Sequence, residues 1–167
     1  MTTPQIVIKP VTPPDVPAIS ALAREIWQAT YPDLITQAQI DFMLELRYGV
    51  ERLYDDIEQA DKWLDQAFYD GRRVGFCAYE IRDGEFYFDK LYIHPDVQRR
   101  GVGGAMINHA DEKARKMGYK RAILDVDKRN TQAINSYKKY GFEVLDSTKA
   151  DVGGGLAMHG FMMAKTL

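Results

Sequence analysis

The sequence of 167 residues is 46% hydrophobic and 28% charged, which is typical of a soluble globular domain and excludes a disordered chain. Its net charge of −2 gives no overall attraction to nucleic acid, and no apolar run approaches the roughly 18 residues of a membrane-spanning helix. Residues 1–5 lack the basic and apolar regions of a signal peptide, and the single cysteine, Cys77, cannot form an internal disulfide. We therefore expect one cytoplasmic domain over residues 1–167, without a nucleic-acid, membrane or metal partner.

The first third of the chain predicts a short strand followed by three helices. Residues 6–8 read as the strand. The combination of Thr12, Pro13 and Asp15 is typical of a helix start, and the apolar spacing extends this helix to about residue 29. Thr36 is suited to cap a second helix. A third helical pattern covers residues 50–57.

An acidic stretch overlaps the second and third helices. From Asp33 to Asp65 the chain carries nine acidic and three basic residues, a net charge of −6. Charge runs are usually solvated helical faces. The alternative is an acceptor site that attracts a cation, and the sequence leaves both interpretations open.

Strands dominate the middle of the chain. Residues 62–69, 73–82 and 85–93 are separated by Asp-Gly turns and predict an antiparallel meander. Helices at 103–117 and 131–139 then alternate with strands at 121–126, 142–145 and 158–165. A strand–loop–helix–strand unit at the centre indicates that part of the sheet is parallel. The predicted fold class is therefore α+β, a mixed α/β domain.

A glycine-rich turn between the strand that ends near Ile93 and the following helix is the most informative segment. Such a turn leaves backbone N–H groups free, and the helix dipole adds positive charge there, so a phosphate or diphosphate site is predicted. The pattern is not a P-loop, because no Gly-Lys-Ser/Thr follows. Nor is it a dinucleotide fingerprint, because Met106 stands where a small residue is needed. The glycines that would let an anion approach, and the arginines that would add charge, are Gly101, Gly103, Gly104, Arg99 and Arg100.

Two segments together resemble the GNAT superfamily of N-acetyltransferases. Gln98-x-x-Gly101-x-Gly103, preceded by Leu91-Tyr92-Ile93-His94-Pro95, is similar to the coenzyme A loop of that family. Asn130-x-x-Ala133-x-x-x-Tyr137-x-x-x-Gly141-Phe142 is similar to its second cofactor segment. The resemblance spans roughly residues 6–167 and is strongest over 90–144. It implies a central, mostly antiparallel sheet of about six to seven strands with a splayed parallel pair, about four to five flanking helices, and acetyl-CoA (coenzyme A) as cofactor.

The resemblance also implies the roles of individual residues toward the cofactor. The free backbone of the strand before the loop would hold the pantetheine arm, and the loop amides from 99 to 104 would hold the diphosphate. Lys139 is a further candidate for a phosphate contact. The implied cofactor-binding residues are Leu91, Tyr92, Ile93, Gln98, Arg99, Arg100, Gly101, Val102, Gly103, Gly104, Ala105, Asn130, Ala133 and Tyr137.

Catalysis requires an acid and a polarising group. Tyr137 matches the family tyrosine beside the thioester sulfur, where a phenol can protonate the departing thiolate. The acetyl carbonyl would be polarised by a backbone N–H at a strand bulge, that of Tyr92 or Ile93.

A base is needed as well, because an alkylamine with a pKa of about 10.4 must lose a proton before it attacks. Asp125 is the first candidate, because Leu124 and Val126 should face the core and alternation turns Asp125 to the other face. Some protein-modifying members of the family carry an acid at this position. Glu80 and Asp89 on neighbouring strands are rivals. In the family, a polar residue at the place of His94 is more often structural.

The acceptor is expected to contact the first third of the chain, with Trp27, Tyr31 and Glu80 as candidate substrate-binding residues. Ile26-Trp27-x-x-Thr30-Tyr31 and the tail from Asp151 to Met163 resemble bacterial Pai-type spermidine/spermine N-acetyltransferases. Those relatives usually carry an acidic pair where His159 and Gly160 stand here.

Three functions follow from this resemblance. The first is acetylation of a small-molecule primary amine, with polyamines among the candidates. The second is acetylation of a protein N-terminus or lysine, and the third is a non-catalytic acyl-CoA sensor. The family resemblance alone implies a homodimer.

Overall fold

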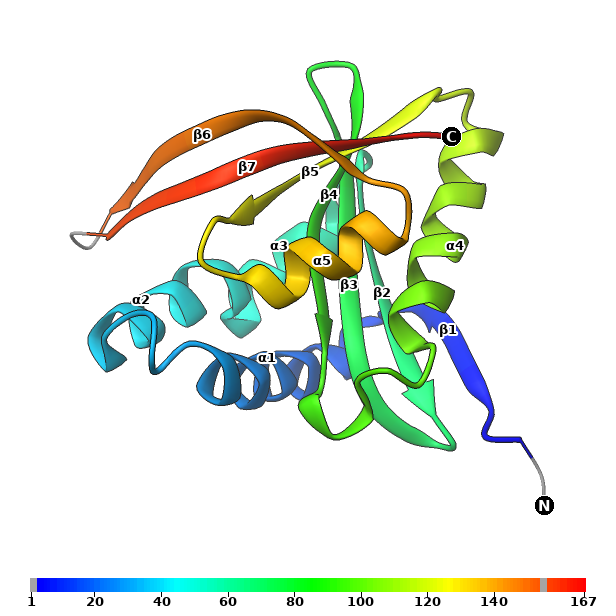
Figure 1. The fold of residues 1–167 in the computed structure, drawn as a ribbon. Coiled ribbons are helices and arrows are strands. Elements are labelled where there is room, and N and C mark those ends of the chain that lie inside the picture. Colours follow the sequence, from blue (N-terminus) through cyan, green and yellow to red (C-terminus); the bar gives the residue numbers. More distant parts are fainter. Residues whose placement is uncertain (1–2, 154–155) are drawn as a thin grey trace.

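The computed structural model describes residues 3–153 and 156–167, which form a seven-stranded sheet with helices on both faces (Figure 1). The strand order is β1-β2-β3-β4-β5-β7-β6, in which β4 and β5 are parallel and all other neighbours are antiparallel. A mostly antiparallel sheet with one parallel pair was predicted and is confirmed. None of the helices in the described ranges has the length and apolarity needed to cross a lipid bilayer.

The predicted strands and helices are all present, with adjusted ends. The strands are β1 Ile6–Pro10, β2 Lys62–Tyr69, β3 Arg72–Arg82, β4 Glu85–Ile93, β5 Arg121–Asp127, β6 Glu143–Gly153 and β7 Leu156–Thr166. The helices are α1 Val16–Thr30, α2 Gln37–Tyr48, α3 Val50–Glu58, α4 Val102–Lys116 and α5 Thr131–Lys139, with short 3-10 turns η1 Pro13–Asp15 and η2 Pro95–Val97.

The largest difference concerns β6, which continues from Leu145 to Gly153, beyond its predicted end. Residues 143–147 are all exposed, so this strand lacks the alternation of buried and exposed side chains that marks a strand in sequence. Its partner is β7, with which it forms a long antiparallel pair. Gly154 and Gly155, which carry part of the tail resemblance, lie outside the described residues.

Side-chain hydrogen bonds cap the start of each of the first two helical segments. Asp15 accepts hydrogen bonds from the main-chain N–H of Thr12 (2.9 Å) and from its hydroxyl (2.7 Å), although the chain first makes a 3-10 turn and α1 starts only at Val16. Thr36 accepts from the N–H of Gln39 at 3.1 Å, and Gln39 accepts from the N–H of Thr36 at 3.0 Å. The pair Thr36 and Gln39 is a reciprocal capping box, and the predicted roles of Asp15 and Thr36 at these helix starts are confirmed.

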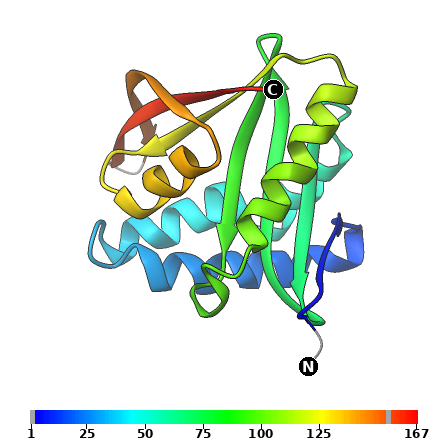
Figure 2. The same cartoon turned by 45° about the vertical axis from the view of Figure 1, so that its right-hand side comes forward.

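Two apolar clusters hold the helices against the sheet. Figure 2 shows α4 in front of the strands, with α1, α2 and α3 behind them. Adjacent residues of β3 belong to different clusters. Cys77 lies on the α4 side in the cluster that contains Met106, and Phe76 lies on the other side in the cluster that contains Ile19. This division follows from the alternation of side chains along a strand.

The parallel pair separates after a short paired segment. Only Phe86 to Phe88 of β4 pair with β5, opposite Ala122 to Leu124. A β-bulge occurs just beyond this segment, because Ala78 and Tyr79 of β3 are opposite Lys90 and Phe88, which leaves Asp89 without a partner. The prediction that placed the bulge at Tyr92 or Ile93 is therefore wrong. Past the bulge the strands diverge, and α5 lies across the resulting fork (Figure 1).

Candidate active site

The fork between β4 and β5 opens into a cleft of about 880 Å³. Most of the residues proposed from sequence meet there, contributed by β4, the loop before α4, β5, α5 and the end of α1. Those that line the cleft are Tyr31, Asp89, Leu91, Tyr92, Ile93, Gln98, Arg99, Gly101, Val102, Gly103, Asp125, Asn130, Ala133, Tyr137 and Lys139. Those that do not line it are Trp27, Glu80, Arg100, Gly104 and Ala105.

The loop before α4 presents a row of free main-chain donors. The backbone is left-handed at Arg99 (φ 65°) and at Gly101 (φ 86°), and the first helical bond runs from the N–H of Ala105 to the carbonyl of Gly101 at 3.0 Å. Within the described part of the chain, the N–H groups of residues 99–104 have no hydrogen-bond acceptor. Alternating left-handed residues ahead of a helix form a concave set of N–H groups that suits an anion.

Tyr140 is a cleft residue that the sequence reasoning missed. Its ring contacts the first turn of α4, because a methyl group on Gly104 would lie 3.1 Å from Cε1 of Tyr140. Gly104 therefore makes room for this ring, whereas the sequence suggested that it kept the way clear for an anion. The available signal was the spacing of three residues from Tyr137, which places both tyrosines on one side of α5.

Past the bulge, the fork side of β4 pairs with no other described strand, and the carbonyl of Ile93 accepts a hydrogen bond from the side-chain amide of Gln98 at 3.4 Å. The N–H of His94 donates to the carbonyl of Val74 at 2.7 Å, so by alternation the main chain of Tyr92 also faces β3. The main-chain groups of Leu91 and Ile93 face the fork instead. This geometry removes Tyr92 from the two candidates for the polarising N–H, although its side chain lines the cleft.

Tyr137 is half-buried in the cleft wall, and its ring centroid lies 5.8 Å from that of Phe142. Burial raises the pKa of Tyr137 well above its ordinary value of 10.0, and the nearby Tyr31 acts in the same direction. The phenol therefore carries its proton at neutral pH. Its helix is capped by Asn130, whose side-chain oxygen accepts from the N–H of Ala133 at 3.2 Å.

Asp89, one of the candidate bases, is surrounded by cations. Its carboxylate lies 2.8 Å from Arg47, 3.5 Å from Arg82 and 3.6 Å from Lys90. Burial alone would raise the pKa of Asp89, but these cations together hold it below its ordinary value. A carboxylate stabilised in this way is a poor proton acceptor.

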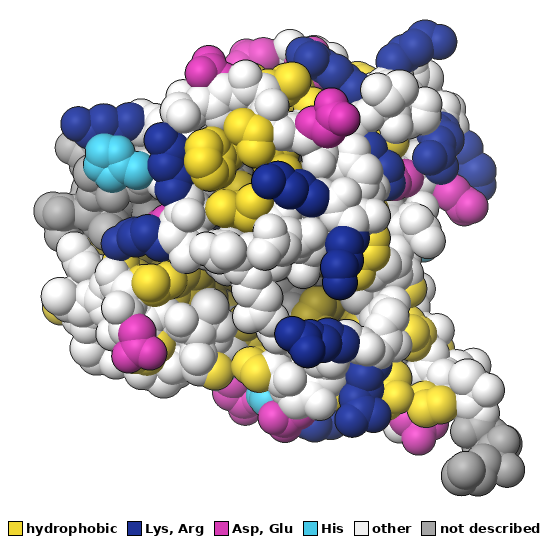
Figure 3. All heavy atoms as spheres, in the orientation of Figure 1, with side chains coloured by type: hydrophobic (Ala, Val, Ile, Leu, Met, Phe, Trp, Pro, Cys, Tyr) yellow, Lys and Arg dark blue, Asp and Glu magenta, His cyan; other side chains and the backbone are white. Residues whose placement is uncertain are grey.

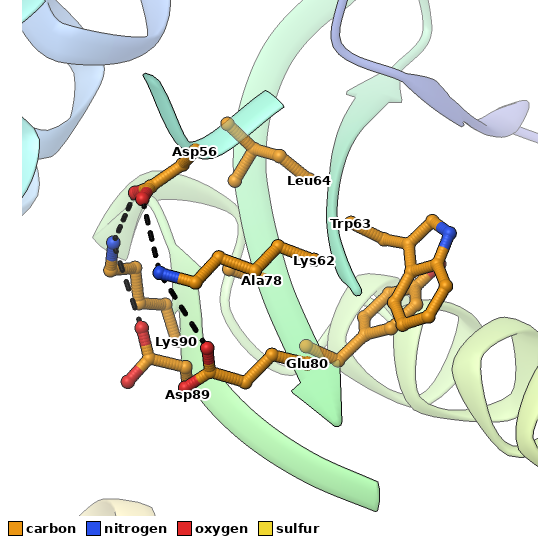
Figure 4. A pocket seen from close by; sticks show the side chains of 9 residues that line it. Asp56, Lys62, Trp63, Leu64, Ala78, Glu80, Asp89 and Lys90 are labelled. Atoms are coloured by element: carbon orange, nitrogen blue, oxygen red, sulfur yellow. Dashed lines mark hydrogen bonds and ion pairs between the residues drawn. The ribbon is translucent and has the colours of Figure 1, made fainter. Parts of the chain in front are cut away.

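Glu80, the third acid considered, lies outside the cleft in a chain of ion pairs (Figure 4). It pairs with Arg82 and lies 3.6 Å from Lys62, which in turn lies 3.4 Å from Asp56. Lys90, nearly fully buried, completes the chain at 3.5 Å from Asp56. The structure does not bring Glu80 to the site, where sequence reasoning had placed it.

Asp125 is the exposed acid of the cleft. It is the first residue of β5 beyond the paired segment, and Leu124 and Val126 on either side are buried, as predicted. Among the described residues no cation lies within ion-pair distance of its carboxylate, which accepts a hydrogen bond from Tyr87 at 2.7 Å. No salt bridge among the described residues therefore opposes protonation of this carboxylate.

His94 has a structural position, as the family pattern suggested. Its Nδ1 accepts from the main-chain N–H of Asp96 at 3.2 Å, which caps the 3-10 turn, and its Nε2 lies 3.3 Å from Glu25. The side chain does not line the cleft. Both imidazole nitrogens are thus engaged away from the fork.

The far end of the cleft is aromatic and acidic. Tyr31 lines it, and Trp27 packs behind Tyr31 with a centroid separation of 4.3 Å, so Trp27 supports the wall without reaching the space. Asp127, which the sequence reasoning did not single out, also lines the cleft and forms a forked ion pair with Arg129 at 2.8 Å. Arg129 also donates to the carbonyl of Leu34 at 3.0 Å, which joins the α1–α2 and β5–α5 connections.

The acidic stretch from Asp33 to Asp65 does not form part of the cleft wall. None of its nine acids lines the cleft, and seven of them are exposed. The structure therefore favours the solvated-face interpretation. In Figure 3, Lys and Arg side chains surround α5 and the loop before α4, and Arg99 and Lys139 are the cations from these segments that line the cleft.

The chain matches a family model described as the Acetyltransferase (GNAT) family over residues 18–142. It is similar to the spermidine N(1)-acetyltransferase of Thermoplasma acidophilum, with 26% identity over 150 residues that cover 87% of this chain and 93% of that protein. It is also similar to the peptidyl-lysine N-acetyltransferase YjaB of Salmonella typhimurium, with 33% identity over 106 residues, 63% of this chain and 66% of that one.

Solved structures share the fold. PaiA N-acetyltransferase from Thermoplasma acidophilum, in complex with coenzyme A, superposes with a TM-score of 0.84 at 24% identity. The superposition covers 98% of this chain and 99% of that chain. This likeness confirms the predicted fold class.

Proposed function

The chain belongs to the GNAT family of acetyltransferases, and on that basis we propose that it transfers an acetyl group from acetyl-CoA to a primary amine of a small molecule. The observation that carries this proposal is the cleft itself. It brings four loop residues with free N–H groups (Arg99, Gly101, Val102 and Gly103) into a single space with Tyr137 and Asp125.

The residues present fit the donor. The concave N–H groups of the loop and the nearby Arg99 and Lys139 suit a diphosphate. The main-chain groups of Leu91 and the N–H of Ile93, which face the fork, suit the amides of a pantetheine arm, which could pair with β4 as an added strand would. Bound acetyl-CoA would supply an activated acyl group and a thiolate leaving group.

Three groups of the chain would then act on the reaction. Tyr137, protonated at neutral pH, would donate its proton to the departing sulfur. A fork-facing N–H of Leu91 or Ile93 would stabilise the charge that develops on the carbonyl oxygen. Asp125 would accept the proton of the attacking amine, directly or through water, since it lines the cleft without a cationic partner among the described residues.

A small acceptor is favoured by a link between two loops near the cleft. Arg129 bridges the α1–α2 and β5–α5 connections, which restricts the path that an extended peptide would need. Asp125 and Tyr31 offer a carboxylate and an aromatic wall, both of which suit an ammonium group. The similarity to a spermidine acetyltransferase makes polyamines the first class to test.

A peptide lysine is the second candidate acceptor. An exposed Asp125 on β5 suits it, and the similarity to YjaB, named a peptidyl-lysine N-acetyltransferase, supports it. We further propose that residues 1–167 act as one domain in the cytoplasm, because the two apolar clusters share β3 and the only cysteine, Cys77, is a buried thiol. A homodimer stays a prediction, which sedimentation would test.

The decisive experiment has two stages. Calorimetry should first detect binding of CoA and acetyl-CoA, and absence of both would remove the proposal. Polyamines, diamines, peptide lysines and peptide N-termini are then offered with acetyl-CoA, and the released thiol is measured. Turnover with peptides alone would replace the small-molecule acceptor, and tight binding without turnover on any amine would indicate a sensor.

A further inference from the structure

Tyr140 has an unusual position for a residue at the end of a surface helix. It follows the last residue of α5, yet its side chain lies over the first turn of α4, which belongs to the other wall of the cleft. A methyl group on Gly103 would lie 3.5 Å from its Oη, and one on Gly104 would lie 3.5 Å from Oη and 3.1 Å from Cε1. The phenol oxygen is therefore held beside the start of α4.

The groups that meet at this point are all hydrogen-bond donors without acceptors. Neither the Tyr140 hydroxyl nor the N–H groups of Val102 and Gly103, three residues that line the cleft, has a hydrogen-bond partner among the residues that the structure describes. The hydroxyl could have accepted a bond from one of these N–H groups, but it does not. Several unpaired donors that converge in one cleft are best satisfied by an anion with several oxygens.

We propose that Tyr140 is a binding residue for the diphosphate of the donor, with its hydroxyl completing the set of main-chain donors at the start of α4. This inference rests on the proposed function. It gives separate roles to Tyr137 in α5 and to Tyr140 just after it. Tyr137 would act at the thiol end of the ligand and Tyr140 would bind the diphosphate end. This role also explains Gly104, since a methyl group there would lie only 3.1 Å from Cε1 and would press on the ring that carries the hydroxyl.

The test compares a ligand that contains the diphosphate with one that lacks it. Affinity for CoA is measured by calorimetry, and affinity for pantetheine by NMR titration, on the wild type and on Tyr140→Phe. Removing the hydroxyl should weaken CoA binding by about tenfold, as loss of a hydrogen bond to a charged group does, and leave pantetheine binding unchanged. Tyr119→Phe is the matched control, because Tyr119 packs against the same apolar cluster and does not line the cleft.

The outcomes separate this inference from the proposed function. Equal weakening of CoA and pantetheine, or no change for either, would overturn the role of Tyr140 while leaving acetyl transfer intact. A wild-type protein that failed to bind CoA would overturn both. The melting temperature of each variant should match that of the wild type. In Tyr140→Phe, the Phe ring preserves the contact with Gly104.

Discussion

The phenol of Tyr87 donates a hydrogen bond of 2.7 Å to Oδ2 of Asp125. Tyr87 lies in the segment of β4 that pairs with β5, and Asp125 is the first residue of β5 beyond that pairing. The bond orients the carboxylate at the point where the two strands separate. Burial raises the pKa of Tyr87, and the Asp125 charge raises it further, so this donor keeps its proton. Asp125 is thereby held in the cleft by a neutral partner and not by a cation.

Replacing Asp125 should therefore remove the base. We expect Asp125→Asn to lower kcat/KM by about 10²- to 10⁴-fold, the usual size of a general-base effect, with little change in CoA affinity. Tyr87→Phe, which frees the carboxylate to rotate, should cause a smaller loss. Asp55→Asn is the control, because Asp55 is exposed on α3 and does not line the cleft. Full activity in Asp125→Asn would assign proton removal to water.

Tyr137→Phe should lower the rate of acetyl transfer by about 10- to 10⁴-fold without weakening CoA binding. Because burial raises the pKa of Tyr137 above 10.0, the phenol stays protonated as pH rises through the neutral range. The profile of kcat against pH should accordingly show no fall caused by this group below about pH 10. An alkaline fall centred below pH 9 in the wild type, absent from Tyr137→Phe, would contradict this assignment.

The phosphate loop can be tested with two glycines of similar backbone geometry. Gly101 (φ 86°) precedes α4 and Gly118 (φ 90°) follows it, and a methyl group at either would meet nothing closer than 3.9 Å. Alanine at each position should thus cost a similar amount, about 1–2 kcal/mol, of folding stability. Only Gly101→Ala should also re-aim the loop N–H groups and weaken CoA binding, by about tenfold or more. Equal CoA affinity in the two variants would disprove a role for the loop geometry.

Asp15 should make the fold sensitive to acid. Hydrogen bonds from the hydroxyl and main-chain N–H of Thr12 lower the pKa of Asp15 from 3.8 to about 2. A lowered pKa means that the ionised group stabilises the fold above pH 3.8 and that this contribution is lost as pH falls through 2. The difference in melting temperature between the wild type and Asp15→Asn should be largest above pH 4 and shrink toward pH 2. A difference independent of pH would show that the charge does not matter.

Local features of this protein could be predicted from its amino-acid sequence. The turn at Gly101, the cap at Thr36 and the ends of most helices depend on the conformational preferences of neighbouring residues. For the same reason the free N–H groups before α4 could be anticipated, since they follow from a glycine turn that leads into a helix. The course of β6 could not, because its exposed residues carry no hydrophobic alternation.

The chemistry of individual acids depended on partners far away in the chain. Arg47 pairs with Asp89 from 42 positions away in the chain, which makes this rival to Asp125 a poor candidate base. Tyr140 reaches the first turn of α4 with its side chain, from the opposite wall of the same cleft. These contacts depend on the strand order and on the bulge at Asp89. Both features arise from the packing of the whole sheet. A carboxylate's surroundings are a property of three-dimensional neighbours, so no local pattern encodes them.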